Sequence, residues 1–429
     1  MLSPNRYNLL ALMLLFALAG TAVAGENDPI LTLVSAVTTA TENNPGLAQI
    51  KVRALAMAAI PSQVGSLPDP MFSFNALNLP VDSFDTRQEN MTQMQVGVSQ
   101  TIPYPGKLAL REEAAAFEAE AAMQNVAEAR WWLQENVKKT WWQIFYLDRA
   151  LQIVDSNQVL LRQFIQVART KYEVGQGLQQ DVLLAQLELS KLLDQQLKLE
   201  GMRRNTVAQL NALLDRPANL PITLPESVDI TLPRLIAETD LYQLAENFRS
   251  LLAAKRESIN AAQSRLDLAH KDYLPDFNVG AAYSARDNMP SGTERADFLS
   301  MKISMTVPIF FASKQDKAVD QRTSELMQKK YALKDELNNV RAQISQSYSN
   351  FQRANDQFIL FKTGIIPQAR QTVASMLAGY QVSKVDFLNL VRSQITLFNY
   401  EMQYWNAFAE ANQSLAQLIA VVGKEEIYE

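Results

Sequence analysis

Residues 277–285, FNVGAAYSA, and residues 298–307, FLSMKISMTV, decide the fold class of this chain. In the first segment every second residue from Phe277 is apolar, and in the second the apolar series begins at Leu299. A period of two residues is the pattern of a β-strand with one apolar and one polar face. These two segments therefore predict a pair of amphipathic strands.

A similar pair lies in the first half of the chain, where Met94, Val96 and Val98 alternate with polar or small residues. Strands of about nine to eleven residues with this alternation are typical of membrane-spanning β-barrels, although an edge of a soluble sheet has the same pattern. Four strands are too few to close a membrane barrel, which needs about eight. A membrane barrel would have to be shared between subunits. The predicted strands span residues 70–79, 91–102, 276–286 and 298–309.

The chain is an internal duplication. Leu67-Pro68-Asp69-Pro70 is matched by Leu274-Pro275-Asp276-Phe277, and Tyr172-Glu173-Val174-Gly175 by Tyr380-Gln381-Val382-Ser383, at offsets of 207 and 208 residues. Collinear matches at nearly one offset indicate a tandem repeat. We expect a first structural repeat over residues 25–219, a proline-rich linker over 220–234 and a second repeat over 235–429, because proline does not continue a helix.

Long helices account for most of each repeat. The segments 107–171 and 313–377 have almost no glycine or proline before Gly364 and Pro367, and each predicts a helix on the order of 100 Å long. Apolar residues at three- and four-residue spacing form a coiled-coil seam in the first segment, interrupted at Gln158. We expect Pro367 to kink the second helix. Shorter helical runs are predicted over residues 179–214, 385–422, 33–60 and 235–273.

Composition excludes several classes of protein. Residues 1–24 have the form of a secretory signal peptide, with Arg6 before an apolar run and Ala22-Val23-Ala24 at the cleavage site. The remainder carries 39 basic and 45 acidic residues, a net charge of −6, which disfavours a nucleic-acid partner. The 429 residues include no cysteine, so neither disulfides nor a cysteine-linked lipid anchor is expected. No later apolar run has the roughly 18 to 20 residues of a spanning helix.

No sequence motif for catalysis or for metal or cofactor binding is present. The chain lacks a nucleophile elbow, a phosphate-binding loop and a zinc-binding H-E-x-x-H segment, and its one histidine, His270, has no second histidine to form a metal site with. We therefore expect no enzyme activity, no cofactor and no resident metal.

The chain resembles the TolC-like outer-membrane efflux proteins. The resemblance rests on the doubled strand pairs, on Tyr172-x-x-Gly175 followed by Asp181-Val182-Leu183, on the echo at Tyr380, and on Pro103-Tyr104-Pro105-Gly106-Lys107 after the second strand. It implies a homotrimer in which twelve strands form a β-barrel in the outer membrane and twelve helices form a periplasmic α-barrel. The implied partners are a periplasmic adaptor protein and an inner-membrane transporter of the RND type, with lipid around the barrel.

The resemblance also implies a function and a gate. The function is an exit duct of a tripartite efflux pump, and Leu67-Pro68-Asp69-Pro70 with residues 78–82 resembles the branch that serves copper/silver or cobalt/zinc/cadmium pumps. Asp181 in the first helix turn and Tyr380 in the second match a pair that holds the tip shut, where a carboxylate accepts the phenolic proton. In the alternative interpretation, Tyr172 and Tyr380 only pack the turns, around Gly175.

Arg392 departs from the family pattern, because an acidic residue is expected twelve positions after the tyrosine, and Asn389 likewise replaces an acid. Three copies of Arg392 would place positive charge in the narrow entrance and repel cations. Alternatively, Arg392 pairs with Asp386 on the tip surface.

Other functions stay open at this stage. A multidrug efflux duct or a type I secretion duct has the same architecture. A periplasmic adaptor or a structural coiled-coil protein also contains long helical hairpins, but the doubled strand pairs argue against both.

Overall fold

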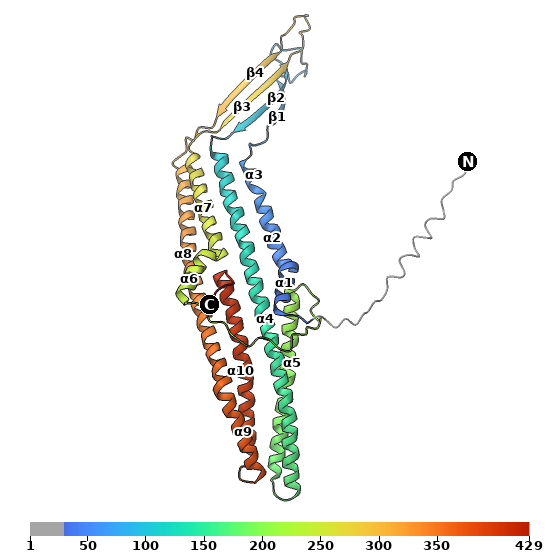
Figure 1. The fold of residues 1–429 in the computed structure, drawn as a ribbon. Coiled ribbons are helices and arrows are strands. Elements are labelled where there is room, and N and C mark those ends of the chain that lie inside the picture. Colours follow the sequence, from blue (N-terminus) through green and yellow to red (C-terminus); the bar gives the residue numbers. More distant parts are fainter. Residues whose placement is uncertain (1–29, 429) are drawn as a thin grey trace, which may run out of the picture.

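The computed structural model describes residues 30–428, and the protein is a long rod with a four-stranded sheet at one end and helical hairpins reaching to the other (Figure 1). The predicted signal peptide lies outside the described residues. The elements are α1 (Leu33–Asn43), α2 (Pro45–Ala58), α3 (Ile60–Gly65), β1 (Met71–Leu77), β2 (Gln93–Ile102), α4 (Lys107–Glu173), α5 (Gln179–Leu213), α6 (Glu238–Phe248), α7 (Ser250–Lys271), β3 (Phe277–Ala285), β4 (Phe298–Met305), α8 (Gln315–Leu360), the π-helical turn η1 (Phe361–Ile365), α9 (Ile366–Gln381) and α10 (Phe387–Val422). The fold class, mostly α-helical with a β portion in a duplicated protomer, is confirmed.

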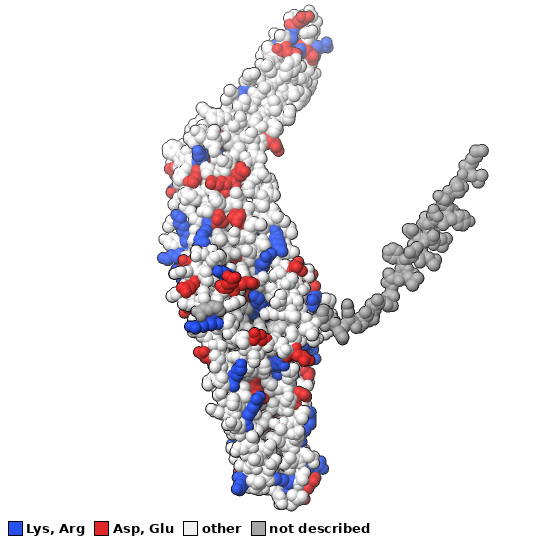
Figure 2. All heavy atoms as spheres, viewed as in Figure 1, with Lys and Arg blue, Asp and Glu red and all other residues white. Residues whose placement is uncertain are grey.

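The sheet is antiparallel in the order β1-β2-β3-β4 and has one apolar face. Phe72 pairs with Val98, Val98 with Ala281, and Ala281 with Met301, so the alternating apolar residues of all four strands lie on the same side. This face is uncovered, and the Met301 side chain is 82% exposed. Figure 2 shows almost no charge along the sheet, whereas acidic and basic residues gather on the loops at its far end.

Strand β4 ends at Met305, four residues before the expected boundary at 309. The Thr306 N–H still donates to the carbonyl of Asp276 in the register of the ladder, but Pro308 has no N–H to donate, so the pairing does not continue. The Ile309 N–H then closes a tight turn onto the carbonyl of Val307. The apolar residue Val307 therefore lies outside the strand.

Helix α4 is continuous over 67 residues, about 100 Å, and is the central column of the first repeat. Helices α2 and α3 pack along one part of α4, and α5 packs along the rest (Figure 1). Together these shorter helices extend along most of the length of α4. The seam is not interrupted at Gln158, which is itself buried and donates to Gln196 Oε1 on α5 at 2.7 Å. Among residues 30–428 no helix is both long enough and apolar enough to cross a membrane.

The long helix of the second repeat contains the π-helical turn η1, which ends two residues before Pro367. A proline inside an α-helix lacks the N–H for the usual hydrogen bond, and its ring collides with the carbonyl four residues earlier. A wider turn relieves that collision, so the helix passes through Pro367 and continues as α9.

Both shorter runs before the strand pairs are divided, contrary to expectation. The first is broken at Asn44, whose side chain accepts from the Leu47 N–H at 3.0 Å and starts α2 at Pro45. The second is broken at Arg249, which has extended backbone between α6 and α7. There the Arg249 guanidinium donates to Glu128 of α4 at 2.6 Å and to the carbonyl of Ala420 at the end of α10.

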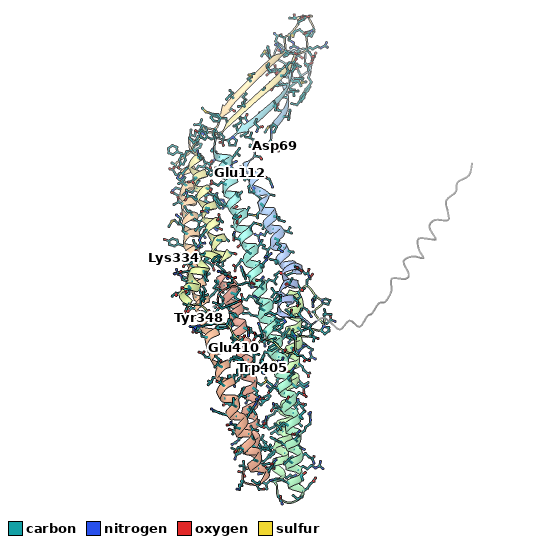
Figure 3. The ribbon with its side chains drawn as sticks, in the orientation of Figure 1. Asp69, Glu112, Lys334, Tyr348, Trp405 and Glu410 are labelled. Atoms are coloured by element: carbon teal, nitrogen blue, oxygen red, sulfur yellow. The ribbon has the colours of Figure 1, made fainter. Side chains whose placement is uncertain are left out.

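The core lies at mid-height, where the two repeats meet. Trp142 and Phe145 of α4 pack against Phe408 of α10, and Trp405 contacts Phe145 with ring centroids 5.8 Å apart (Figure 3). The non-helical segment after α5 crosses this region with Ile222 and Leu224 buried. The hairpins are therefore anchored at their centre, while both ends of the rod extend away from the core.

Candidate functional site: the helical tip and the membrane end

The end of the rod opposite the sheet is formed by two helix turns, α4–α5 and α9–α10 (Figure 1). In each turn the residue three positions after the tyrosine has positive φ, Gly175 at 75° and Ser383 at 58°. The amide that follows closes the turn, from Gln176 to the Lys171 carbonyl and from Lys384 to the Gly379 carbonyl, both at 2.8 Å. The two turns are therefore built alike, although a serine occupies a backbone conformation that favours glycine.

Lys171 joins the two turns. Its Nζ donates to the carbonyl of Tyr380 at 2.7 Å and to Ser383 Oγ at 3.1 Å, and it lies 4.5 Å from the centre of the Tyr380 ring. These contacts combine charge-assisted hydrogen bonds with a cation–π interaction. The ammonium thus ties the end of α4 to the second turn.

Tyr380 is 5% exposed and packs against Phe387 with ring centroids 5.2 Å apart. Its hydroxyl has no hydrogen-bond partner among the described residues, so it does not donate to Asp181 within this protomer. Burial, and then the charge of Asp181, raise the pKa of the phenol. The two groups therefore influence each other without the predicted bond, because packing and Lys171 hold the ring.

Asp181 is partly buried in the first turn of α5. Burial is the largest cause that raises the pKa of its carboxyl, a backbone hydrogen bond from Leu178 lowers it, and the negative charge of Asp386 raises it again. The two acids come from different helix turns. The carboxyl is therefore more easily protonated than an ordinary aspartate.

The other predicted tip residues are exposed. Tyr172 is 48% exposed, Asp386 caps the start of α10 without a side-chain hydrogen bond, and Asn389 lies one turn further along that helix. Arg392 is also exposed and forms no ion pair with Asp386 or any other acid in residues 30–428. The interpretation in which Arg392 pairs with Asp386 is therefore not supported within one protomer.

Lys171 was not identified from the sequence. It lies next to the motif tyrosine, at the carboxyl end of a helix where a cation is favoured, but many helices end with a lysine. Its role depends on contact with residues more than 200 positions away, which no local pattern indicates.

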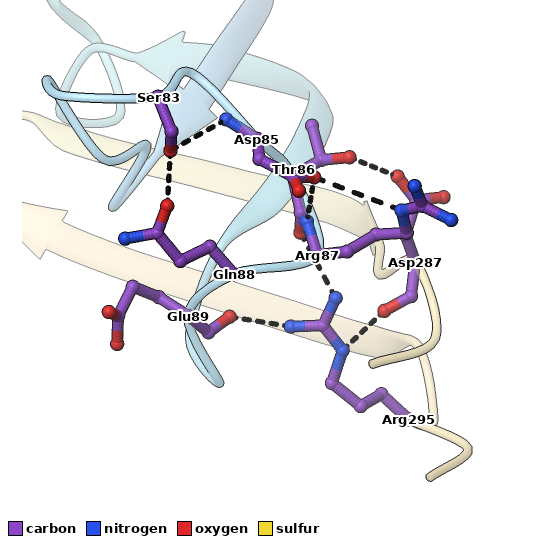
Figure 4. Close-up of polar contacts among 8 residues, drawn as sticks. All are labelled: Ser83, Asp85, Thr86, Arg87, Gln88, Glu89, Asp287 and Arg295. Atoms are coloured by element: carbon purple, nitrogen blue, oxygen red, sulfur yellow. Dashed lines mark hydrogen bonds and ion pairs between the residues drawn. The ribbon is translucent and has the colours of Figure 1, made fainter. Parts of the chain in front are cut away.

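At the opposite end, two loops beyond the sheet are joined by arginines (Figure 4). The Arg295 guanidinium donates to the carbonyls of Glu89 at 2.6 Å and Thr86 at 3.0 Å on the β1–β2 loop, and to that of Asp287 on its own loop. Arg286 donates to the Asn90 carbonyl at 2.6 Å. Backbone carbonyls of irregular loops need donors, and two guanidinium groups supply them here.

No group of three or more residues suited to hold a metal ion occurs in residues 30–428.

Comparison with known proteins identifies the fold. The solved structure of the outer membrane protein VceC from Vibrio cholerae has a TM-score of 0.75 and 14% identity over 92% of this chain and 97% of that one. The structure of CusC has a TM-score of 0.77 and 16% identity over 91% of this chain and 92% of that one.

Sequence comparison gives shorter matches. The alkaline protease secretion protein AprF of Pseudomonas aeruginosa is 24% identical over 254 residues, which is 56% of this chain and 51% of that protein. The chain spans about half the length of the curated relatives it matches. The profile of the outer membrane efflux protein family matches residues 37–216 and 241–424, which lie within the two expected repeats and make up most of the chain. The chain therefore belongs to the outer membrane efflux protein family.

Proposed function

We propose that the protein is one third of an exit duct in the outer membrane, in which three copies close a twelve-stranded barrel and a twelve-helix tunnel. The observation that carries the proposal is a sheet with a bare apolar face and two unpaired edges, β1 and β4. Lipid is the solvent that suits such a face, and a membrane does not tolerate open edges. If β4 pairs with β1 of the next copy, the sheet has no open edge and its apolar face can contact lipid all around.

The internal repeat specifies the register of that pairing. Val98 of β2 pairs with Ala281 of β3 inside the protomer. The counterpart of Val98 is Ile303, by the offset of 205 residues that relates Pro103 to Pro308, and the counterpart of Ala281 is Phe74, by the offset of 207 residues. Ile303 should therefore face Phe74 of the next copy. Both side chains belong to the apolar face, so the register keeps that face continuous around the barrel.

Engineered cysteines test this assembly directly, because the chain has none of its own. A variant with Phe74→Cys and Ile303→Cys should form intermolecular disulfides on oxidation, seen as dimer- and trimer-sized bands in the outer-membrane fraction. Facing residues in antiparallel strands lie about 4.5 to 5.5 Å apart, within disulfide range. The matched control, Asn75→Cys with Ile303→Cys, puts one thiol on the opposite face and should stay monomeric. A soluble, monomeric periplasmic product overturns the proposal.

We further propose that the tip formed by the α4–α5 and α9–α10 turns is the periplasmic gate. Asp181, Tyr380, Tyr172, Gly175, Asp386, Asn389 and Arg392 are its candidate residues, and Lys171 joins them. The contact of Lys171 with Tyr380 supports this assignment, since it joins the two hairpins that must separate to widen a tunnel. The proposed partners are a periplasmic adaptor and an inner-membrane RND-type transporter.

Two substrate classes follow from different observations. Leu67-Pro68-Asp69-Pro70 and residues 78–82 favour heavy-metal efflux, of the copper/silver or cobalt/zinc/cadmium type. The similarity to AprF favours protein secretion. Deleting the gene and measuring metal tolerance against secreted protein in the same strain distinguishes them: metal sensitivity with normal secretion supports the first, and the reverse supports the second.

A further inference from the structure

The four strands of the sheet carry a single charged side chain. Among the residues of the four strands, only Lys302 on β4 is acidic or basic. It belongs to the polar face, because its partner across β3 is Gly280, which in turn pairs with Ser99 of β2. A charged residue in such a segment is costly on the lipid side and is tolerated on the water-filled side.

The neighbours of Lys302 leave its side chain free. Gly280 has no side chain, and Ser300 and Ser304 flank Lys302 on the same face of β4. Lys302 is exposed and has no hydrogen bond or ion pair in the part of the chain that the structure describes. The ammonium of Lys302 therefore projects from a surface whose neighbouring side chains are small.

No acid within residues 30–428 forms an ion pair with this ammonium. Asp276, at the helical end of the sheet, accepts from Lys107 Nζ at 2.9 Å. Asp297, at the far end, accepts from the Arg286 N–H at 2.9 Å and from the Tyr283 hydroxyl. The loops beyond the strands, residues 78–92 and 286–297, contain six acidic and three basic residues. Their net charge is therefore negative, opposite to the charge of Lys302.

We propose that Lys302 is a selectivity residue of the duct, and that three copies form a cationic ring on the inner wall of the barrel. The inference rests on the proposed trimeric channel. The ring favours anionic and uncharged substrates and disfavours free divalent cations, so a metal ion would leave more readily as a neutral or anionic complex. The polar face, the small neighbours and the missing counter-charge all support this assignment.

The size of the effect follows from Coulomb attraction in water. Three charges on the order of 10 Å from the ion's path, screened over a Debye length of about 10 Å at 0.1 M salt, lower the local concentration of a monovalent cation about twofold. A divalent cation carries twice the charge, so its concentration falls about fourfold. At 1 M salt, where the Debye length is about 3 Å, the effect should disappear.

Reversal potentials of the purified trimer in planar bilayers test the proposal. Lys302→Gln should lower the chloride-to-potassium permeability ratio about fourfold at 0.1 M KCl and raise the magnesium-to-potassium ratio about twofold. Lys302→Arg should match the unaltered protein. Moving the charge two residues along the same face, in Lys302→Gln with Ser300→Lys, should restore its selectivity.

The outcomes separate this inference from the proposed function. If the trimer conducts but Lys302→Gln leaves both permeability ratios unchanged at 0.1 M salt, Lys302 is not a selectivity residue. The proposed channel function is then still supported. If the unaltered protein forms no trimer and no conductance, the channel proposal fails first. A shift that persists at 1 M salt also overturns the inference, because its cause would then be a change of shape.

Discussion

Lys171 is the residue on which the proposed closed tip depends most. Its ammonium is the only atom that reaches both a backbone carbonyl and a hydroxyl of the second turn among the tip contacts described above. Methionine has a stem of similar length and no charge. Lys171→Met should therefore destabilise the closed tip by about 1 kcal/mol, because the contact between the hairpins is lost. The ratio of open to closed channels should rise about fivefold. Single-channel recordings measure that ratio.

Lys384 is the matched control for this change. It lies in the second turn, is exposed, and its ammonium has no contact within residues 30–428. Lys384→Met removes the same charge from the same tip and should leave the open probability unchanged. An equal rise in both variants would attribute the effect to tip charge and not to the Lys171 contact.

Asp181 should make the gate sensitive to pH. Its carboxyl pKa lies above the ordinary value of 3.8, through burial and through the nearby negative Asp386, when the hairpins are together. A raised carboxyl pKa means that the closed arrangement holds the proton more firmly than a separated one. Closure is then stabilised at low pH and weakens as pH rises through the raised pKa.

The expected result is an open probability that increases as the pH rises from the ordinary carboxyl pKa of 3.8 through the raised pKa of Asp181. Asp181→Asn, which stays neutral throughout, should remove this dependence and remain closed more often at neutral pH. A pH profile identical to that of the unaltered protein would assign the titration to another group.

Arg392 allows a separate test of the entrance. It is exposed without an ionic partner in the described protomer, so its charge is available to passing ions. If three copies line the entrance, Arg392→Asp should shift the reversal potential towards cations, because a ring of like charge repels ions of its own sign. An unchanged reversal potential would mean that the side chain points away from the path.

At the scale of elements, the two outer loops behave as one unit. Arg295 satisfies carbonyls on both loops, and hydrogen bonds to a charged group contribute about 1.5 to 3 kcal/mol each. Arg295→Gln should therefore increase local opening and make the loops at least about fivefold more sensitive to proteinase K on intact cells. Arg87→Gln is the control, because the Arg87 guanidinium makes only a loose 3.8 Å pair with Asp85 among the described residues. Equal cleavage of both variants would argue against the joined loops.

The elements also show what sequence could and could not predict. The absence of glycine and proline predicts α4, and alternation predicts the four strands, because both signals are local. The break at Asn44 was predictable from an Asn-Pro pair, a common helix start. The break at Arg249 has no such signal, since it arises where one guanidinium reaches Glu128 and the Ala420 carbonyl, both far away in sequence.

At the scale of the whole molecule, the tandem repeat explains why the tip was only partly predictable. The repeat identifies equivalent positions, so the turns around Gly175 and Ser383 follow from comparison of the two halves. It does not indicate which side chains of one turn contact the other. The Tyr380 hydroxyl was expected to bond to Asp181, but Lys171 contacts the tyrosine instead. Which residue contacts Tyr380 depends on how the two halves pack.

The same repeat predicts an ion pair between copies where helices meet sheet. Within the protomer, the start of α4 contacts the segment before β3 through Lys107 and Asp276, with Nζ and Oδ1 2.9 Å apart. The equivalent contact of the second repeat would join the start of α8 to the segment before β1 of the next copy, where Asp69 is the counterpart of Asp276 (Figure 3). Lys314 is the counterpart of Lys107 at the same offset of 207 residues. Both Asp69 and Lys314 are exposed in one protomer.

We therefore expect Lys314 to pair with Asp69 of the neighbouring copy. Asp69→Lys or Lys314→Asp alone places like charges together at three interfaces, each losing about 1 kcal/mol, and should lower the temperature at which the trimer dissociates on a gel. The double exchange reverses both charges and should recover most of the loss, because the pair is restored. If the double variant is no more stable than the single ones, the two residues do not meet, and the repeat does not govern contacts between copies at this junction.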